Sequence, residues 1–392
     1  MEKFLSNKLE LLFILLFFLY FLLFPISNYT TLILELKAIL TILIFSIFLL
    51  LLKKIKIANF LKLSSEDLLT LIFFIYLTLS IIWSNNPNFG IIKLLHFILQ
   101  FLPFYIFFKS INSEIINKKH LIVLLNLLNI TAISIAIYII IYNPFIFENY
   151  QIIYRKFSHV YPARIISFAL IINLLVFYKK ELNRIFNISF LLFLIILGFA
   201  LSLTAHRTSI FAVIFCSLLI FLINIKDQSL KNKFILMPFI LFFGISLILS
   251  KNFSNRTFEQ SLNRIIIEDA TISSRLNSIK ISWEIWNQNK IFGAGIGGFY
   301  SPISKKELGP NILYPHNLFF ELLCETGLIG LILFVILFTK SLKFIINNDY
   351  KKELIILWFY FFINSITSKD ITINFPVFIF FYFNFLFDRK LN

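Results

Sequence analysis

Charged residues are scarce in this sequence of 392 residues. Asp, Glu, Lys and Arg make up only 14% of it, whereas 59% is hydrophobic and phenylalanine alone occurs 52 times. A water-soluble surface needs more charged side chains, and no soluble core can bury so much apolar side chain. The composition therefore excludes the ordinary soluble classes and indicates a chain whose solvent is the lipid bilayer.

Cysteines and acidic residues are also few. Cys216 and Cys324 both lie in apolar segments, and no C-x-x-C or His/Cys cluster has the spacing of metal ligands. We therefore expect neither a disulfide nor a metal site. The formal net charge of +16 does not indicate a nucleic-acid partner, because most lysines and arginines stand at the ends of apolar segments rather than on one soluble face.

Long apolar runs predict an all-α integral membrane protein with about 12 transmembrane helices. A bilayer core of about 30 Å needs roughly 20 apolar residues per helix, because each segment must satisfy its own backbone polar groups. The candidate spans are residues 10–27, 31–52, 68–84, 91–108, 121–142, 163–178, 185–204, 209–225, 234–250, 318–339, 353–366 and 374–387. They divide the chain into a nine-helix region (1–250), one large outer loop (251–317) and three C-terminal helices (318–392).

The distribution of basic residues predicts the orientation. With the N-terminus inside, the cytoplasmic segments hold 21 lysines and arginines and the short outer loops hold 4. Because this bias in short loops sets membrane topology, we expect a multi-pass protein with both termini in the cytoplasm.

The outer loop of about 67 residues is long enough to be functional. From Ile272 onward, apolar residues recur at helical spacing (Leu276, Ile279, Trp283 and Trp286), with Ser273 or Ser274 as N-cap. This pattern predicts an amphipathic helix along the outer membrane boundary, although a helix that packs over the bundle also fits it.

A glycine-rich stretch, Gly293-Ala-Gly-Ile-Gly-Gly298, follows that helix and matches the dinucleotide-binding pattern G-x-G-x-x-G. That pattern binds a pyrophosphate only between a strand and a helix, whereas here a helix precedes it and Tyr300 and Pro302 follow. We therefore expect a tight turn that returns the chain to the membrane, with backbone N–H groups open to an anion as a further option.

Polar residues open the tenth span. His316 stands at its mouth, and three residues at steps of four share one helix face: Asn317, Glu321 and Glu325. A charged residue near mid-span costs on the order of 2.5 to 3.5 kcal/mol on insertion scales, so these carboxylates need a polar cavity or a partner. Both a functional role and a structural pair with a cation of another span, such as Arg164 or Lys93, remain open.

Three elements between about residues 198 and 335 stand in a characteristic order. They are Ser202-Leu-Thr-Ala-His-Arg-Thr-Ser209, the stretch from Arg275 through Ile291-Phe-Gly-Ala-Gly-Ile-Gly-Gly-Phe299, and Pro315-His-Asn through Glu325-Thr-Gly-Leu-Ile-Gly330. They resemble the L-T-x-S-R, R…W…P-x-x-G-x-G and H-N…E-x-G-x-x-G elements of the O-antigen ligase and O-antigen polymerase superfamily. The chain departs from the family pattern where His206 replaces a small Ser and where Ile291-Phe292 replaces a common Pro.

The resemblance implies a GT-C-like glycosyltransferase of the bacterial inner membrane, with a periplasmic catalytic face and no metal or other cofactor. Its partners would be membrane lipids, an undecaprenyl-diphosphate-linked glycan as donor, and lipid A core or another surface glycan as acceptor. The resemblance makes His316 the catalytic base, and Arg207 and Arg275 the residues that bind the donor diphosphate. The candidate supporting residues are Asn317, Glu321, Glu325 and Arg164, with His206 and His159 as further helpers.

These residue types suit transfer from a diphosphate. Planar guanidinium groups can hold the negative charge that develops as the sugar C1–O bond breaks. Imidazole, with a reference pKa of about 6.5, is a suitable base for an acceptor hydroxyl. Direct displacement inverts the anomeric centre.

Other function classes fit less well. A polymerase would use the same donor and compartment, but the single large loop just before the His316 helix favours a ligase. A flippase or transporter would concentrate its charges in the membrane midplane and have little use for the long loop. A structural scaffold would not need the Arg and His elements.

Overall fold

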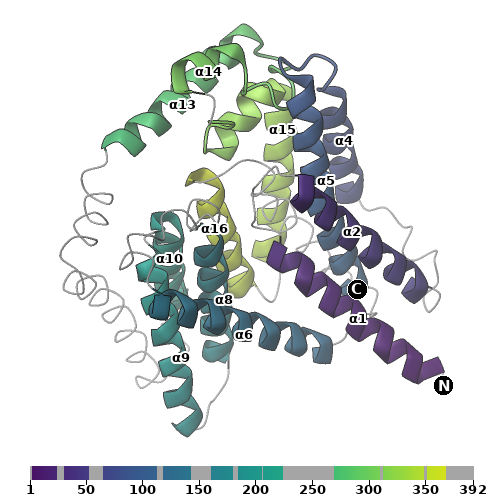
Figure 1. Ribbon diagram of the computed structural model, residues 1–392, viewed down its shortest axis with the longest axis vertical. Coiled ribbons are helices and arrows are strands. Elements are labelled where there is room, and N and C mark those ends of the chain that lie inside the picture. The colour runs from purple at the N-terminus through teal and green to yellow at the C-terminus, as the bar shows by residue number, and fades with distance from the viewer. Residues whose placement is uncertain are drawn as a thin grey trace. The chain divides into compact units, whose positions relative to one another are not determined.

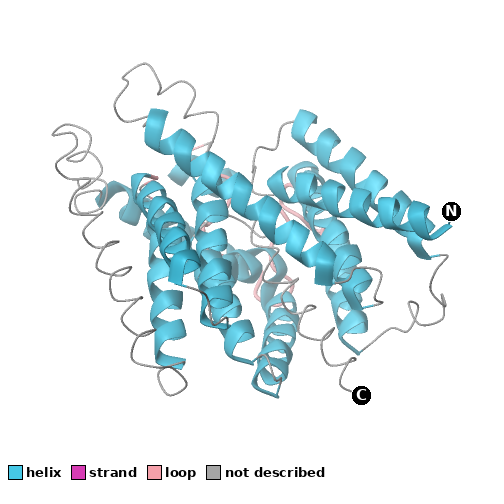
Figure 2. Ribbon diagram, turned by 90° about the horizontal axis from the view of Figure 1, so that it is seen from below, coloured by secondary structure: helices cyan, strands magenta, loops and turns pink. Residues whose placement is uncertain are grey.

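The protein is described from a computed structural model that covers residues 2–23, 31–52, 65–112, 118–142, 160–179, 184–204, 206–223, 269–309, 312–347 and 351–367. Helices make up nearly all of this part, and no strand occurs within these ranges (Figure 2). The all-α prediction is therefore confirmed for the described residues. The predicted spans 234–250 and 374–387 and the candidate helper His159 lie outside them.

Each predicted span within the described ranges coincides with a helix (Figure 1). These helices are α1 (Glu2–Leu23), α2 (Thr31–Leu52), α4 (Ser65–Leu79), α5 (Pro87–Asn112), α6 (Lys118–Tyr142), α8 (Val160–Lys179), α9 (Arg184–Leu203), α10 (Arg207–Ile223), α15 (Leu318–Asn347) and α16 (Lys351–Thr367). In the described residues, three helical stretches are long and apolar enough to cross a membrane: Pro87–Phe107, Ile122–Ile141 and Leu318–Lys343. The total of about twelve spans stays a prediction.

The chain divides into two compact units, each of which combines segments that are distant in sequence. Unit 1 comprises Met1–Leu124, Ala270–Lys351 and Ser365–Asn392. In it, α1 packs on α2, both contact α5, and α4 packs on α15. Phe17 of α1 stacks on Phe107 of α5 with ring centroids 3.8 Å apart, and the Tyr20 hydroxyl donates to the Leu99 carbonyl.

Unit 2 comprises Leu125–Asp269 and Lys352–Asn364. Here α8 packs against α9 and α10. Asn129 of α6 and Asn173 of α8 exchange side-chain hydrogen bonds of 2.6 and 3.2 Å. Such reciprocal amide bonds satisfy polar groups that would be costly to leave alone in an apolar bundle.

Two further helices of unit 1 lie in the predicted outer loop: α13 (Asp269–Gln288) and α14 (Pro302–Leu308). The predicted amphipathic helix is thus present, but it begins at Asp269, so the predicted N-cap at Ser273 or Ser274 is wrong.

Helix α13 packs on the rest of unit 1 through residues beside the predicted apolar face. Ile281 and Ile285 are buried against the glycine-rich stretch and α15, whereas Leu276 is 59% and Trp283 48% exposed. Of the predicted apolar face, Trp286 packs against the same cluster, whereas Leu276 and Trp283 stay exposed. The place of α13 along the membrane boundary stays a prediction.

Candidate active site

The glycine-rich stretch, residues 293–298, forms a turn that is held between two parts of unit 1. On one side lies α15, which is broken at Gly327, where φ is 65° and ψ is −162°. The break leaves backbone groups of α15 without their usual helical partners. The loop supplies replacements: Ala294 N donates to Cys324 O at 2.8 Å, and Leu328 N donates to Lys290 O at 3.0 Å.

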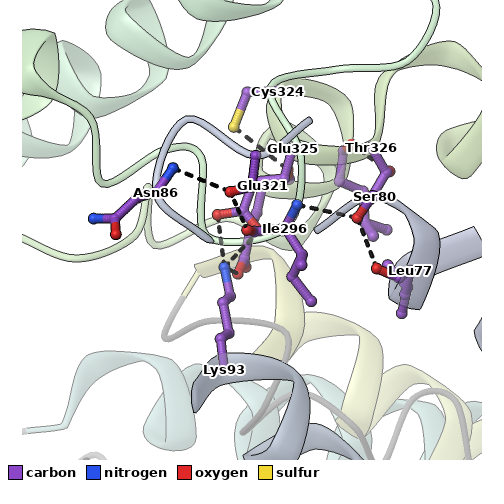
Figure 3. Close-up of polar contacts among 11 residues, drawn as sticks. Leu77, Ser80, Asn86, Lys93, Ile296, Glu321, Cys324, Glu325 and Thr326 are labelled. Atoms are coloured by element: carbon purple, nitrogen blue, oxygen red, sulfur yellow. Dashed lines mark hydrogen bonds and ion pairs between the residues drawn. The ribbon is translucent and has the colours of Figure 1, made fainter. Parts of the chain in front are cut away.

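On the other side lies the turn that joins α4 to α5. The Ser80 hydroxyl accepts from Ile296 N at 3.1 Å, and the Ser84 hydroxyl donates to Ile296 O at 2.8 Å. Asn85 N donates to Ala294 O at 2.9 Å. Figure 3 shows Ser80 reaching both Ile296 and the end of α4. The glycine-rich turn thus connects three helices of unit 1.

Close backbone approach explains why glycine is needed in this turn. Gly295 has φ +77°, and a Cβ atom there would lie 2.5 Å from Ser80 O and against the Ser84 backbone. Gly293 has φ +71°, and its Cβ would lie 2.5 Å from Gly327 N. A side chain at either position would both strain the backbone and push the helices apart.

The amide groups of the turn are largely engaged within the protein. Besides Ala294 and Ile296, Gly293 N donates to Asn289 O and Gly298 N donates to Gly295 O, both at 2.8 Å. These four amides are therefore not available to an anion, which argues against anion binding by the backbone at these positions. The turn is a structural connector.

Lys93 on α5 pairs with both carboxylates of α15. Its Nζ lies 2.6 Å from Glu321 Oε1 and 2.7 Å from each carboxylate oxygen of Glu325. The Lys93 side chain is 0% exposed, and those of Glu321 and Glu325 are 1% and 3% exposed. Figure 3 shows Lys93 pointing at the two glutamates. Of the cations considered as partners, the structure selects Lys93, and it confirms that the two glutamates share one face.

His316 lies immediately before α15. Its backbone φ of 59° is in the left-handed region, which is uncommon for a residue other than glycine. The half-buried imidazole packs edge-on against Tyr314, with ring centroids 4.7 Å apart. Asn317 follows as N-cap: its Oδ1 accepts from Phe319 N at 3.0 Å and from Phe320 N at 3.2 Å.

Arg275 lies in the second turn of α13, and its side chain is exposed. It belongs to the same unit as His316, Asn317, Glu321 and Glu325. Unit 1 therefore contains the predicted base, one of the two predicted diphosphate ligands and most of the supporting residues.

The remaining candidates lie in unit 2. Arg207 is the first residue of α10, and His206 precedes it as N-cap, with Nδ1 3.3 Å from Ser209 N and 2.8 Å from Ser209 Oγ. Arg164 on α8 is buried, and its backbone carbonyl accepts from Tyr360 Oη at 3.0 Å.

The sequence reasoning missed the residues of the α4–α5 turn. Ser80, Ser84, Asn85 and Asn86 all contact the glycine-rich turn or the residues just after it; Asn86 Nδ2 donates to Tyr300 O at 3.0 Å. The available signal was a run of Ser and Asn just before Pro87, which marks a turn between two apolar helices. It gave no indication of what the turn contacts.

Comparisons with known proteins bear on the predicted resemblance. A family model described as O-antigen ligase matches residues 191–335 of the chain. A search of curated proteins finds no match. The matched segment contains α10, α13, α14 and the first part of α15, and with them Arg207, Arg275 and His316.

Proposed function

We propose that this chain transfers a glycan from undecaprenyl diphosphate to lipid A core or another surface acceptor, as a ligase does, because a family model described as O-antigen ligase matches its residues 191–335. The family match supports a ligase-like or polymerase-like function of a membrane protein that acts on lipid-linked glycans. The donor, the acceptor and the periplasmic face of the inner membrane belong to the proposal.

The proposed reaction is a direct displacement at the sugar C1 atom. His316 takes the proton of the acceptor hydroxyl, whose oxygen forms the new bond to C1 while the C1–O bond to the diphosphate breaks. Undecaprenyl diphosphate leaves with the bonding electron pair. Arg207 and Arg275 stabilise its negative charge with paired hydrogen bonds, in the role that a divalent cation has in other transferases.

The observation that carries this proposal is the placement of His316 within the matched segment. Its imidazole is half-buried and flanked by Tyr314, at the start of a capped helix whose first two turns are tied to α5. A general base must be held in one orientation while it stays accessible to substrate. The start of α15 meets both requirements.

A transfer assay with purified protein in detergent tests the proposal. The donor is the undecaprenyl-diphosphate-linked glycan extracted from a strain in which the gene is deleted, and the acceptor is lipid A core from the same strain. We expect transfer without any ion gradient and in the presence of excess EDTA. His316→Asn tolerates the left-handed backbone but removes the base, so we expect a loss of activity of about 100-fold or more. Lys306→Ala, on exposed α14, is the matched control and should keep wild-type transfer.

The glycolipids of the deletion strain separate the ligase from the polymerase. A ligase mutant should show bare acceptor on a gel while long chains accumulate on undecaprenyl diphosphate. A polymerase mutant should instead show acceptor capped by one repeat unit. That pattern would refute the ligase proposal and leave the glycosyltransferase assignment in place.

A further inference from the structure

We infer that Lys93 is a positioning residue for His316, and that it acts through Glu321. The inference rests on the proposed function, in which His316 is the base. It adds a residue of α5, outside the matched segment, to those on which transfer depends.

The link from Lys93 to His316 runs through the first turn of α15. Lys93 Nζ lies 2.6 Å from Glu321 Oε1 as an ion pair, and Glu321 N donates to Asn317 O at 3.0 Å, which closes that turn. Asn317 caps the helix and follows His316 directly in the chain. Because His316 sits in a left-handed conformation at this junction, a rotation of the first turn would redirect its imidazole.

The second turn of α15 has polar anchors of a different kind. Cys324 O accepts from Ala294 N at 2.8 Å, and Thr326 O accepts from the Tyr76 hydroxyl at 2.7 Å. These backbone contacts join residues 324–326 to the glycine-rich turn and to α4 whether or not Lys93 is charged. In the first turn, a side-chain ion pair ties the backbone to α5.

This asymmetry separates a positioning role from a merely structural one. Glu325 places both of its oxygens 2.7 Å from Lys93 Nζ, so loss of its charge should remove at least as much stability as loss of the Glu321 charge. If the ion pairs only stabilise the fold, the Glu325 variant should lose at least as much activity as the Glu321 variant. If Lys93 positions His316 through Glu321, the Glu321 variant should lose more activity than the Glu325 variant.

The test compares Glu321→Gln with Glu325→Gln in the transfer assay described above. Both variants are purified as full-length protein, and kcat and KM for the lipid-linked donor are measured per folded molecule, beside the thermal unfolding midpoint in detergent. For Glu321→Gln we expect kcat to fall about 10-fold or more with little change in KM, because a catalytic group displaced by about 1 Å can lose up to 100-fold. For Glu325→Gln we expect kcat to fall only about 3-fold, with an unfolding midpoint at least as low as that of Glu321→Gln.

The matched control is Glu284→Gln on α13. It removes the carboxylate of a surface pair with Lys280, in which the Glu284 side chain is 47% exposed and the N–O distance is 4.0 Å. It should change neither kcat nor the unfolding midpoint, since exposed pairs contribute little. Glu321→Asp, which keeps the charge on a shorter side chain, replaces Glu321→Gln under the same criteria if that variant does not fold.

A Glu321 variant with wild-type kcat would overturn the inference. The inference would also be overturned if Glu325→Gln lost more kcat and more stability than Glu321→Gln, because a purely structural ion pair predicts that result. A wild-type protein that transfers no glycan would instead refute the proposed function, and the role of Lys93 would fall with it.

Discussion

The start of α15 and the start of α10 both carry a proposed active-site residue, yet they are built in different ways. Around α15 the decisive contacts join distant residues: Lys93 and Glu325 are 232 positions apart, and Tyr76 and Thr326 are 250 apart. Before α10 they are local, since His206 bonds Ser209 three residues later. The first region therefore depends on the assembly of unit 1, whereas the cap of α10 is formed by neighbouring residues.

The largest expected effect concerns the membrane side of the two regions, because the proposed transfer needs both on the periplasmic face. Basic residues in short loops predict that alkaline phosphatase fused after Thr204 or after Gln288 is active, and that a fusion after Lys233 is inactive. The measurement is phosphatase activity in intact cells, with immunoblots to show equal expression. Activity after Lys233 alone would reverse the predicted orientation and refute the periplasmic face of the proposed reaction.

An intermediate effect is expected where the α15 region depends on close backbone approach. Gly309 has φ +87°, and a Cβ atom there would meet nothing within 4 Å. Gly309→Ala should therefore lower the free energy of unfolding only by the backbone strain, about 1 to 3 kcal/mol. Gly295 has a similar φ, but a Cβ atom there would press on Ser80 and Ser84. Gly295→Ala should therefore lower the free energy of unfolding by about 1 to 3 kcal/mol more than Gly309→Ala does.

Unfolding of the two glycine variants in detergent, followed by heat or by titration with SDS, measures this difference. Equal stabilities would show that the glycine-rich turn is not packed as tightly as described. In that case close packing between distant segments would not distinguish the α15 region from the α10 region.

The smallest effect is expected at the α10 region, where the contact is local. His206 caps α10: its carbonyl accepts from Ile210 N at 3.2 Å and its Nδ1 accepts from Ser209 N at 3.3 Å. His206→Ala should cost about 1 kcal/mol of stability, whereas His206→Ser should cost much less because serine is itself a good N-cap. The same unfolding experiment measures both variants. If the serine variant is no more stable than the alanine variant, capping is not what His206 contributes.

The residues themselves show how far sequence reasoning reaches in this protein. Helical spacing placed Asn317, Glu321 and Glu325 on one face, and for the two glutamates the structure confirms this through their shared contact with Lys93. The choice between Lys93 and Arg164 as the partner was open, because both are basic residues in apolar spans and their distance in space depends on helix packing. Helical spacing also predicted the apolar face of α13 with Trp283 and Trp286, but not that Ile281 and Ile285 pack on the glycine-rich turn, because only the neighbouring segments decide which apolar residues are covered.

The sequence by itself determined the features that depend on composition and on neighbouring residues. The shortage of charge required apolar helices, the step of four aligned the glutamates of α15, and the ordered Arg and His elements pointed to the family whose model matches residues 191–335. Only the tertiary structure decided that the glycine-rich turn joins α4, α5 and α15, and that Lys93 pairs with Glu321 and Glu325. The reason is physical: local hydrogen bonds and helical periodicity act over a few residues, whereas an ion pair between α5 and α15 exists only once packing has brought together segments more than 200 residues apart.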